Sequence, residues 1–297
     1  MFEALLSPFL VPFDGDFSST DALTQPPSNA PGKKSCRKKR KKLTQRLHNL
    51  QRRLYAQDKF SLLLVFQAMD AAGKDGTIRA VMSGVDPAGC QVSSFKKPSA
   101  EELDHDFLWR TSKQLPERGR IGIFNRSYYE EVLVVRVHPG ILEYQKLPYR
   151  INEDTIWQER YQSILEHERH LARAGTVILK FWLNVSRNEQ ARRLVSRLED
   201  SEKRWKFSPG DLDERDHWDD YQAAFEEAIA ATSRPWAPWY AIPADSKPYM
   251  RMVVAETIVK TLESLPLEYP KGKEITAEEV ELYRGRLLRS NLKQPNG

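Results

Sequence analysis

Five short apolar runs, separated by stretches with helical character, set the strongest limit on how this chain can fold. The runs cover residues 61–68, 91–95, 120–125, 176–185 and 239–244. Runs rich in β-branched and aromatic residues that alternate with helices are typical of a parallel sheet covered on both faces. We therefore expect an α/β fold with a five-stranded parallel sheet. At 297 residues, the chain is long enough for one such domain with an added arm or lid.

Helix and loop signals divide the rest of the chain. Residues 1–32 are rich in Pro, Ser and Asp, which predicts an extended or wrapped leader rather than a packed element. Residues 33–58 predict a basic amphipathic helix, starting near Ser35, because leucines recur at 43, 47, 50 and 54. We expect residues 59–265 to form the α/β domain, with a lid at about 187–220, and residues 266–297 to form a C-terminal tail.

Two predicted helices have recognisable ends. One begins after Asn152, has acidic residues in its first turn and ends before Gly175. The last helix of the domain runs to Leu262, and Asp245 or Ser246 is expected to cap its start.

Positive charge is concentrated in one segment. Residues 33–53 contain 11 Lys or Arg and no acid, whereas the rest of the chain has 35 basic and 41 acidic residues. The body is therefore not a general nucleic-acid binder, and the basic segment needs its own explanation.

Composition also bears on the cellular compartment. Cys36 and Cys90 cannot form a disulfide framework, which fits a reducing cytoplasm. No apolar run approaches the roughly 18 residues of a membrane span. The first residues lack the basic region of a signal peptide. We expect a cytoplasmic protein with no membrane partner.

The first apolar run leads directly into the turn QAMDAAGKDGTI. Small residues let backbone amides approach an anion, the following helix adds a positive dipole, and a lysine adds a point charge. The strict P-loop pattern is broken by Ala68 in place of the first glycine and by Asp75 in place of Ser or Thr. An ordinary β–α turn is the alternative. The residues expected to bind phosphate are Ala72, Gly73, Lys74, Gly76 and Thr77.

The third apolar run ends in NRSYYEE. Ligands of parallel sheets bind outside such carboxyl ends, which makes Asn125, Arg126 and Glu130 candidates for the site. A plain helix start capped by Asn125 or Ser127 is the alternative, but it leaves Arg126 without a role.

Further cations follow the second and fourth apolar runs. Lys96 and Lys97 end the second run on the ligand side. Residues 187–220 are dense in Lys and Arg, which fits either a solvated helical hairpin or a lid that closes over a polyanion. The lid cations are Arg192, Arg193, Arg197, Lys203, Arg204, Lys206 and Arg215.

Four segments together resemble the polyphosphate kinase 2 family: QAMDAAGKDGTI, SFKKPSAEELDHDFLWR, GIFNRSYYEEVLVVRVHP and RWKFSPGDLDER. The resemblance implies a thymidylate-kinase-like P-loop fold that moves a phosphoryl group between inorganic polyphosphate and a nucleotide. The NRSYYE form is similar to the branch that accepts nucleoside mono- and diphosphates, such as AMP and ADP. The resemblance favours Lys96, Arg197, Lys203 and Lys206 as substrate contacts.

The resemblance also implies a divalent metal ion, Mg or Mn, at the site. Many family members carry an aspartate where this chain has Asn125, and an amide is a weaker ligand for a hard cation. Asp70 is therefore the expected ligand for Mg (or Mn), with Glu130 or a phosphate oxygen as the second. Tyr128 is a candidate for lining the nucleotide pocket, with core packing as the alternative.

The expected mechanism is in-line transfer without a covalent enzyme intermediate, which depends on positioning and charge neutralisation. Lys74 and the 72–77 backbone would hold the transferring phosphate, Arg126 would clamp the nucleotide phosphate, and Asp75 would orient waters of the metal. The alternatives are an ATP-dependent nucleoside or nucleotide kinase and a non-catalytic polyanion-binding protein. The basic 33–53 segment is expected to contact polyphosphate, with a solvated tail or a subunit contact as the alternative. A homo-oligomer, dimer or tetramer, is expected.

Overall fold

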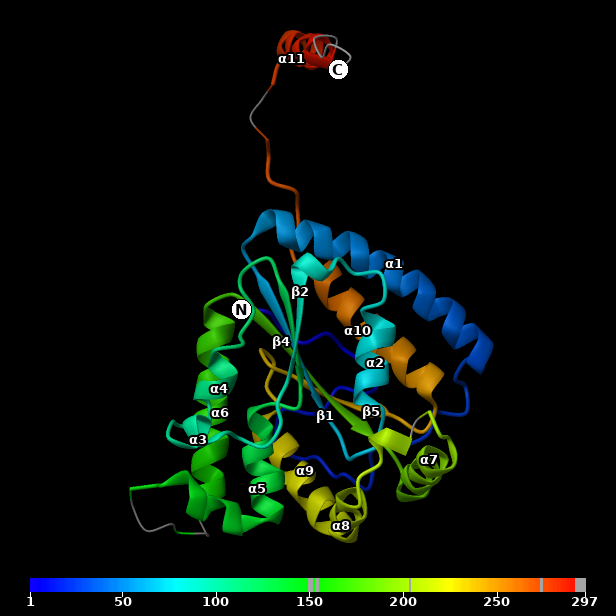
Figure 1. Cartoon of the computed structure of the whole chain (residues 1–297), viewed down its shortest axis with the longest axis vertical. Coiled ribbons are helices and arrows are strands. Elements are labelled where there is room, and N and C mark those ends of the chain that lie inside the picture. Colours follow the sequence, from blue (N-terminus) through cyan, green and yellow to red (C-terminus); the bar gives the residue numbers. More distant parts are fainter. Residues whose placement is uncertain (149–151, 153–154, 203, 273–274, 292–297) are drawn as a thin grey trace, which may run out of the picture.

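A five-stranded, wholly parallel sheet forms the centre of the computed structural model, which describes the chain except residues 149–151, 153–154, 203, 273–274 and 292–297 (Figure 1). The strand order is β2-β3-β1-β4-β5. The strands are β1 Ser61–Gln67, β2 Cys90–Ser94, β3 Ile121–Asn125, β4 Thr176–Asn184 and β5 Trp239–Pro243. Each lies within one residue of the predicted runs, so the predicted α/β sheet is confirmed.

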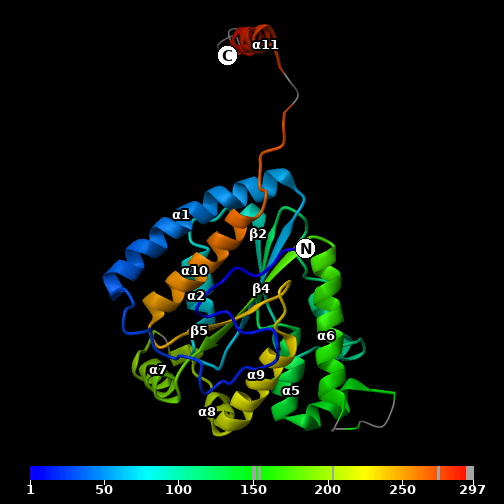
Figure 2. The same ribbon diagram turned by 180° about the vertical axis from the view of Figure 1, so that it is seen from behind.

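Helices cover both faces of this sheet (Figures 1 and 2). One face carries α1 Lys33–Gln57, α2 Lys74–Val81 and α10 Lys247–Ser264; the other carries α5 Val134–Val137, α6 Ile156–Arg173 and α9 Trp218–Thr232. The remaining elements are η1 Pro87–Gly89, α3 Ala100–Leu103, α4 Trp109–Ser112, η2 Tyr128–Val132, η3 Pro139–Gln145, α7 Arg187–Glu199, η4 Arg204–Lys206, α8 Gly210–Asp216 and α11 Ala277–Asn291. None of the helices in the described part of the chain is long and apolar enough to cross a membrane.

The predicted basic helix is α1, which begins at Lys33. Leu43, Leu47, Leu50 and Leu54 are all buried, as their spacing predicts. They pack onto α10, which lies between α1 and the sheet and is buried on nearly all sides (Figure 2). The helix ends at Asp58, whose backbone is left-handed and whose N–H donates to the carbonyl of Leu54.

The N-terminal leader is extended, as predicted, but the prediction that it does not pack is wrong. Phe9 and Val11 are buried in the core. The Val11 N–H donates to the Trp239 carbonyl (3.0 Å), and the Ala241 N–H donates to the Phe9 carbonyl (2.8 Å). The leader therefore runs antiparallel along β5 and covers the edge of the sheet, where unpaired backbone groups would otherwise be exposed.

Three predicted boundaries need correction. The helix predicted to follow Asn152 begins at Ile156, although Gly175 does follow its end with a positive φ of 93°. Ser246 is the N-cap of α10 but makes no side-chain cap, and Asp245 instead accepts a hydrogen bond from the Ser186 N–H at the start of α7. The predicted C-terminal tail contains α11, which Figure 1 shows apart from the sheet and its covering helices.

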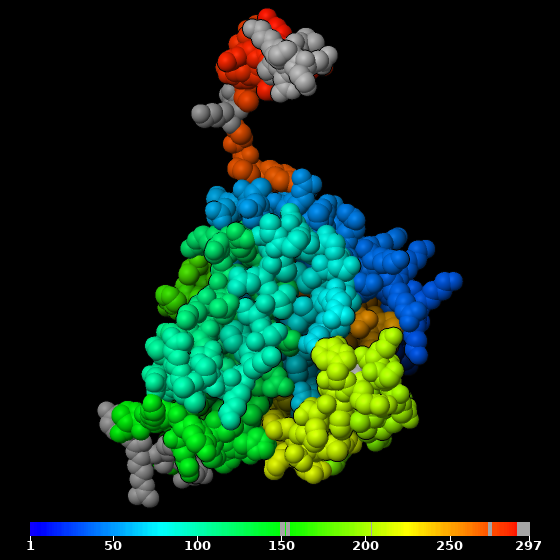
Figure 3. Space-filling view, viewed as in Figure 1, coloured from blue at the N-terminus to red at the C-terminus, as the bar shows by residue number. Residues whose placement is uncertain are grey.

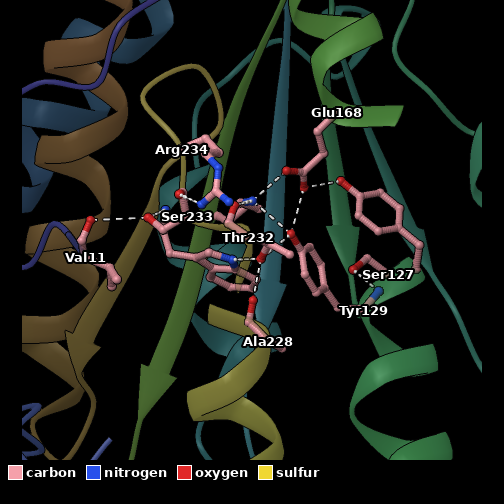
Figure 4. A network of polar contacts seen from close by, with 11 residues as sticks. Val11, Ser127, Tyr129, Glu168, Ala228, Thr232, Ser233 and Arg234 are labelled. Atoms are coloured by element: carbon pink, nitrogen blue, oxygen red, sulfur yellow. Dashed lines mark hydrogen bonds and ion pairs between the residues drawn. The ribbon is translucent and has the colours of Figure 1, made fainter. Parts of the chain in front are cut away.

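A buried polar network ties β4 to α6 and α9 (Figure 4). Lys180, in the middle of β4, is fully buried, and its ammonium donates to Glu168 Oε2 (2.6 Å) and to the Thr232 carbonyl (2.8 Å). The hydroxyls of Tyr128 and Tyr129 donate to the other oxygen of Glu168. Burial lowers the pKa of Lys180 to about 8, so the charged form is held only by these partners.

Candidate active site

A cleft of about 870 Å³ lies at the carboxyl edge of the sheet. The loop after β1, the ends of β2 and β3, and the lid elements α7 and η4 contribute its walls. The residues that line it include many candidates from the sequence, among them Asp70, Ala72, Gly73, Lys74, Asp75, Gly76, Lys96, Asn125, Arg126, Arg197 and Lys206. The sheet topology thus brings together side chains that are up to 136 positions apart in the chain, from Asp70 to Lys206.

The loop between β1 and α2 is shaped by two residues with left-handed backbone. Ala71 has φ 60° and Gly73 has φ 107°. Gly73 is the N-cap of α2 and provides no side-chain cap, so the first amides of the helix are left for another acceptor. A helix start of this kind, with small residues around it, favours an anion.

Lys74 is the first residue of α2. Its ammonium donates to the Ala68 carbonyl at 2.6 Å, which folds the side chain back over the loop. Burial lowers the pKa of Lys74, and the nearby Asp70 carboxylate opposes that shift. The lysine is therefore a fixed point charge in the mouth of the loop.

Arg126 joins the loop after β3 to the loop after β1. Its guanidinium contacts Asp70 Oδ1 at 3.1 Å and Glu130 Oε2 at 3.3 Å. The Glu130 carboxylate raises the pKa of Arg126, and burial opposes this effect. Arg126 itself has a left-handed backbone (φ 66°), so this position is locally strained, as is common at functional sites.

Asn125 and Asp75 contact each other. The Asn125 amide donates to Asp75 Oδ1 at 2.7 Å, between the end of β3 and the first turn of α2. The Asn125 amide thus positions a carboxylate that lines the cleft.

The lid consists of α7, η4 and α8. Arg197 on α7 contacts Asp211 on α8 at 3.2 Å; Lys206 on η4 and Lys96, which follows β2, both line the cleft. On the face shown in Figure 3, the lid stands below the N-terminal end of α1 and beside α2. Lys203, predicted to bind substrate, lies outside the described residues.

Sequence reasoning missed how α7 supports the phosphate loop. Arg193 is buried, and its guanidinium donates to the carbonyls of Ala72 (2.6 Å) and Ala244 (2.6 Å). The Gln190 amide donates to the carbonyl of Asp70 at 3.1 Å. Arg193, one of the predicted lid cations, thus holds the loop backbone in place. The sequence signal for this role was that Arg193 lies four residues after Glu189, a spacing at which the two side chains pair on one helix face.

Two predicted substrate contacts are not supported by the structure. Tyr128 is fully buried and is bonded to Glu168, so it packs in the core rather than lining the nucleotide pocket. The Thr77 side chain is also fully buried and faces Met250, while its N–H donates to the Gly73 carbonyl within the helix.

The donor set of the cleft fits Mg²⁺. Within the described residues, no three His, Cys, Asp or Glu side chains lie close enough to hold a metal ion by themselves. Mg²⁺ does not require such a cage, because it usually binds through one or two carboxylates together with waters and substrate phosphates. The Asp70 carboxylate, about one third exposed and lining the cleft, is suited to that role.

Comparison with known proteins identifies the family. The model of the polyphosphate kinase 2 family matches residues 31–269. An ADP-polyphosphate phosphotransferase from Rhodopseudomonas palustris is 53% identical over 246 residues, which cover 82% of this chain and 85% of the relative. An AMP/ADP-polyphosphate phosphotransferase from Meiothermus ruber is 49% identical over 229 residues, covering 77% and 82%.

A solved structure agrees with these relatives. The crystal structure of polyphosphate kinase 2 from Arthrobacter aurescens TC1 superposes with a TM-score of 0.86 at 38% identity, covering 93% of this chain and 95% of that one. This chain belongs to the polyphosphate kinase 2 family.

Proposed function

We propose that this chain transfers the terminal phosphoryl group between inorganic polyphosphate and nucleoside mono- or diphosphates by direct in-line displacement. The observation that carries the proposal is the gathering of cations from separate elements around the phosphate loop: Lys74, Lys96, Arg126, Arg197 and Lys206. Family membership supports the same reaction.

The cleft residues have separate roles that follow from their positions. Lys74 and the open amides of α2 hold the transferring phosphate and neutralise charge as it develops, which is the main requirement of phosphoryl transfer. Arg126, fixed between two carboxylates, presents a planar pair of donors to the nucleotide phosphate. The lid cations, led by Arg197 and Lys206, close over the anions and exclude water.

The acceptor is a nucleoside mono- or diphosphate rather than a nucleoside. Relatives are named for ADP, for AMP and ADP, and for GDP, so the base varies while the phosphate donor stays the same. An ATP-dependent nucleotide kinase is the competing function. The two are separated by incubating AMP with polyphosphate or with ATP and quantifying ADP by chromatography. We expect ADP to form with polyphosphate as donor; ADP formed from AMP and ATP without polyphosphate would favour the competing function.

Mg²⁺ (or Mn²⁺) is the proposed cofactor, and Asp70 would hold it. When bound, the ion neutralises phosphate charge. We expect Asp70→Asn to raise the Mg²⁺ concentration needed for half-maximal activity at least about tenfold, because a neutral amide is a weaker ligand. Asn125→Asp should keep or lower that concentration. Metal binding to each variant is also measured directly by calorimetry with a bound nucleotide.

Glu130→Gln tests the candidate second ligand separately from Asp70. It removes the other carboxylate that contacts Arg126 and leaves Asp70 in place. A Mg²⁺ requirement equal to that of the parent is expected if Asp70 and phosphate oxygens hold the ion; a raised requirement would make Glu130 the second ligand. If Asp70→Asn titrates with Mg²⁺ as the parent does, the metal ligand lies elsewhere.

We further propose a cytoplasmic homo-oligomer that does not bind nucleic acid. The uneven charge and the two unpaired cysteines, Cys36 and Cys90, support this proposal. Light scattering of the purified protein measures the oligomeric state.

A further inference from the structure

The cations of α1 fall on two flanks with different partners. On the flank away from the cleft, Lys39 pairs with Glu256 at 2.8 Å and Arg46 pairs with Glu263, both on α10. On the flank toward α2, Arg40 donates to the carbonyl of Ala80. In the described part of the chain, Arg37 forms no ion pair with a carboxylate. The acids of α10 therefore neutralise one flank and leave the other positive.

Arg251 connects that positive flank to the phosphate loop. It lies in the second turn of α10 and lines the cleft, and a Cβ added to Gly76 would meet its Nη2 at 2.8 Å. Glycine at position 76 thus makes room for this guanidinium. The Nε atom of Arg251 is buried and has no hydrogen-bond partner among the described residues. Such an unsatisfied charged donor is costly unless a ligand completes it.

The charges that act on Arg251 are themselves positive. Burial lowers its pKa, and Arg40, Arg193, Arg37 and Arg79 lower it further. Neither Arg79 nor Arg251 forms an ion pair with a carboxylate anywhere in the described ranges of the chain. A group of like charges without counter-charge repels itself, so its arrangement favours a bound anion.

We propose that Arg251, Arg37, Arg40 and Arg79, here called the outer cation site, hold the distal phosphates of the polyphosphate donor. The site rests on the proposed function and extends it from the cleft to the surface. In Figure 3, the N-terminal end of α1 (blue), α10 (orange) and α2 (cyan) meet on one face just above the lid. In this arrangement the near end of the donor chain lies at the phosphate loop and its distal phosphates lie on this face.

The test compares two double variants that remove equal charge. Arg37→Gln/Arg79→Gln removes the exposed cations of the outer cation site, and Lys39→Gln/Arg46→Gln removes cations from the paired flank. We measure KM for long-chain polyphosphate, tripolyphosphate and ADP at two salt concentrations. We also measure binding of labelled long-chain polyphosphate without nucleotide. Deleting residues 1–42 is a poor alternative, because it would remove the buried Phe9 and Val11.

The first double variant should raise KM for long chains at least about fivefold and reduce the salt slope of binding by about 1 to 2, by analogy with the counterions released at each phosphate contact. KM for tripolyphosphate and ADP should not change. The control should leave the salt slope within about 0.5 of the parent. Equal salt slopes of polyphosphate binding in the two double variants would overturn the proposal. An equal rise in KM for long-chain polyphosphate and tripolyphosphate would also overturn it. Binding of RNA serves as a further check. If the first double variant lost affinity for RNA but kept its affinity for long-chain polyphosphate, the proposal would be overturned.

Arg251→Met gives a readout that does not depend on turnover. Because it relieves repulsion among neighbouring arginines, the thermal midpoint without ligand should stay the same or rise, while binding of long chains weakens. A lower midpoint would assign Arg251 a structural role and overturn the proposal. A parent protein that binds long chains through these arginines but forms no ATP would refute the proposed function and leave the outer cation site standing.

Discussion

Lys74→Ala is expected to lower turnover at least about a hundredfold, the scale seen when a charge that stabilises a phosphoryl or acyl transition state is removed. The ammonium lies at the mouth of the phosphate loop, and its hydrogen bond there is to the Ala68 carbonyl. The fold should therefore survive, because the backbone of the loop is held by Arg193 and Gln190 instead. Steady-state kinetics and circular dichroism check both parts.

Lys59→Ala is a suitable control, since Lys59 is exposed and lies at the start of β1, at the opposite end of that strand from the cleft. It should keep parental turnover. Near-normal turnover in a folded Lys74→Ala variant would contradict the assignment of this turn as the phosphate loop.

Lys180→Met should reduce the free energy of unfolding by about 3–5 kcal/mol, the usual cost of leaving one member of a buried ion pair without its partner. Glu168 would keep only the two tyrosine hydroxyls. The double variant Lys180→Met/Glu168→Leu should recover much of the loss, because neither charge then remains buried. Denaturant unfolding of the three proteins measures the effect. A loss under about 1 kcal/mol for Lys180→Met would contradict a structural role for this network.

The sheet and the phosphate loop were predictable because their signals are local. Each strand is a continuous apolar run, and the loop carries its small residues and lysine in one turn. The gathering of Lys96, Arg126 and Arg197 also followed from topology, since carboxyl ends of parallel strands share one edge.

The predictions that failed concern side chains whose burial depends on a partner distant in sequence or on the inward face of a helix. Tyr128 is fixed by Glu168, forty positions away, which no local pattern discloses. Thr77 shares the buried face of α2 with Ile78 and Val81, and helical spacing alone would have placed it inward. The leader packs because Phe9 and Val11 alternate along an edge strand, a period-two signal too short to stand out.

Arg251 was also missed, for a related reason. Within its helix it is one of five charged residues, and in the sequence it resembles an ordinary surface position. Its importance follows only from the approach of α1 and α2, which brings Arg37, Arg40 and Arg79 near it.

The most direct test of the central claim is phosphorus NMR of the purified protein with Mg²⁺, ADP and polyphosphate. Direct transfer predicts that the γ-phosphate signal of ATP grows as chain phosphate is lost, with no inorganic phosphate released. The Lys74→Ala variant should show neither change on the same timescale. Release of inorganic phosphate in place of ATP, or no reaction in the parent protein, would contradict the assignment of this cleft as a polyphosphate-dependent phosphotransferase site.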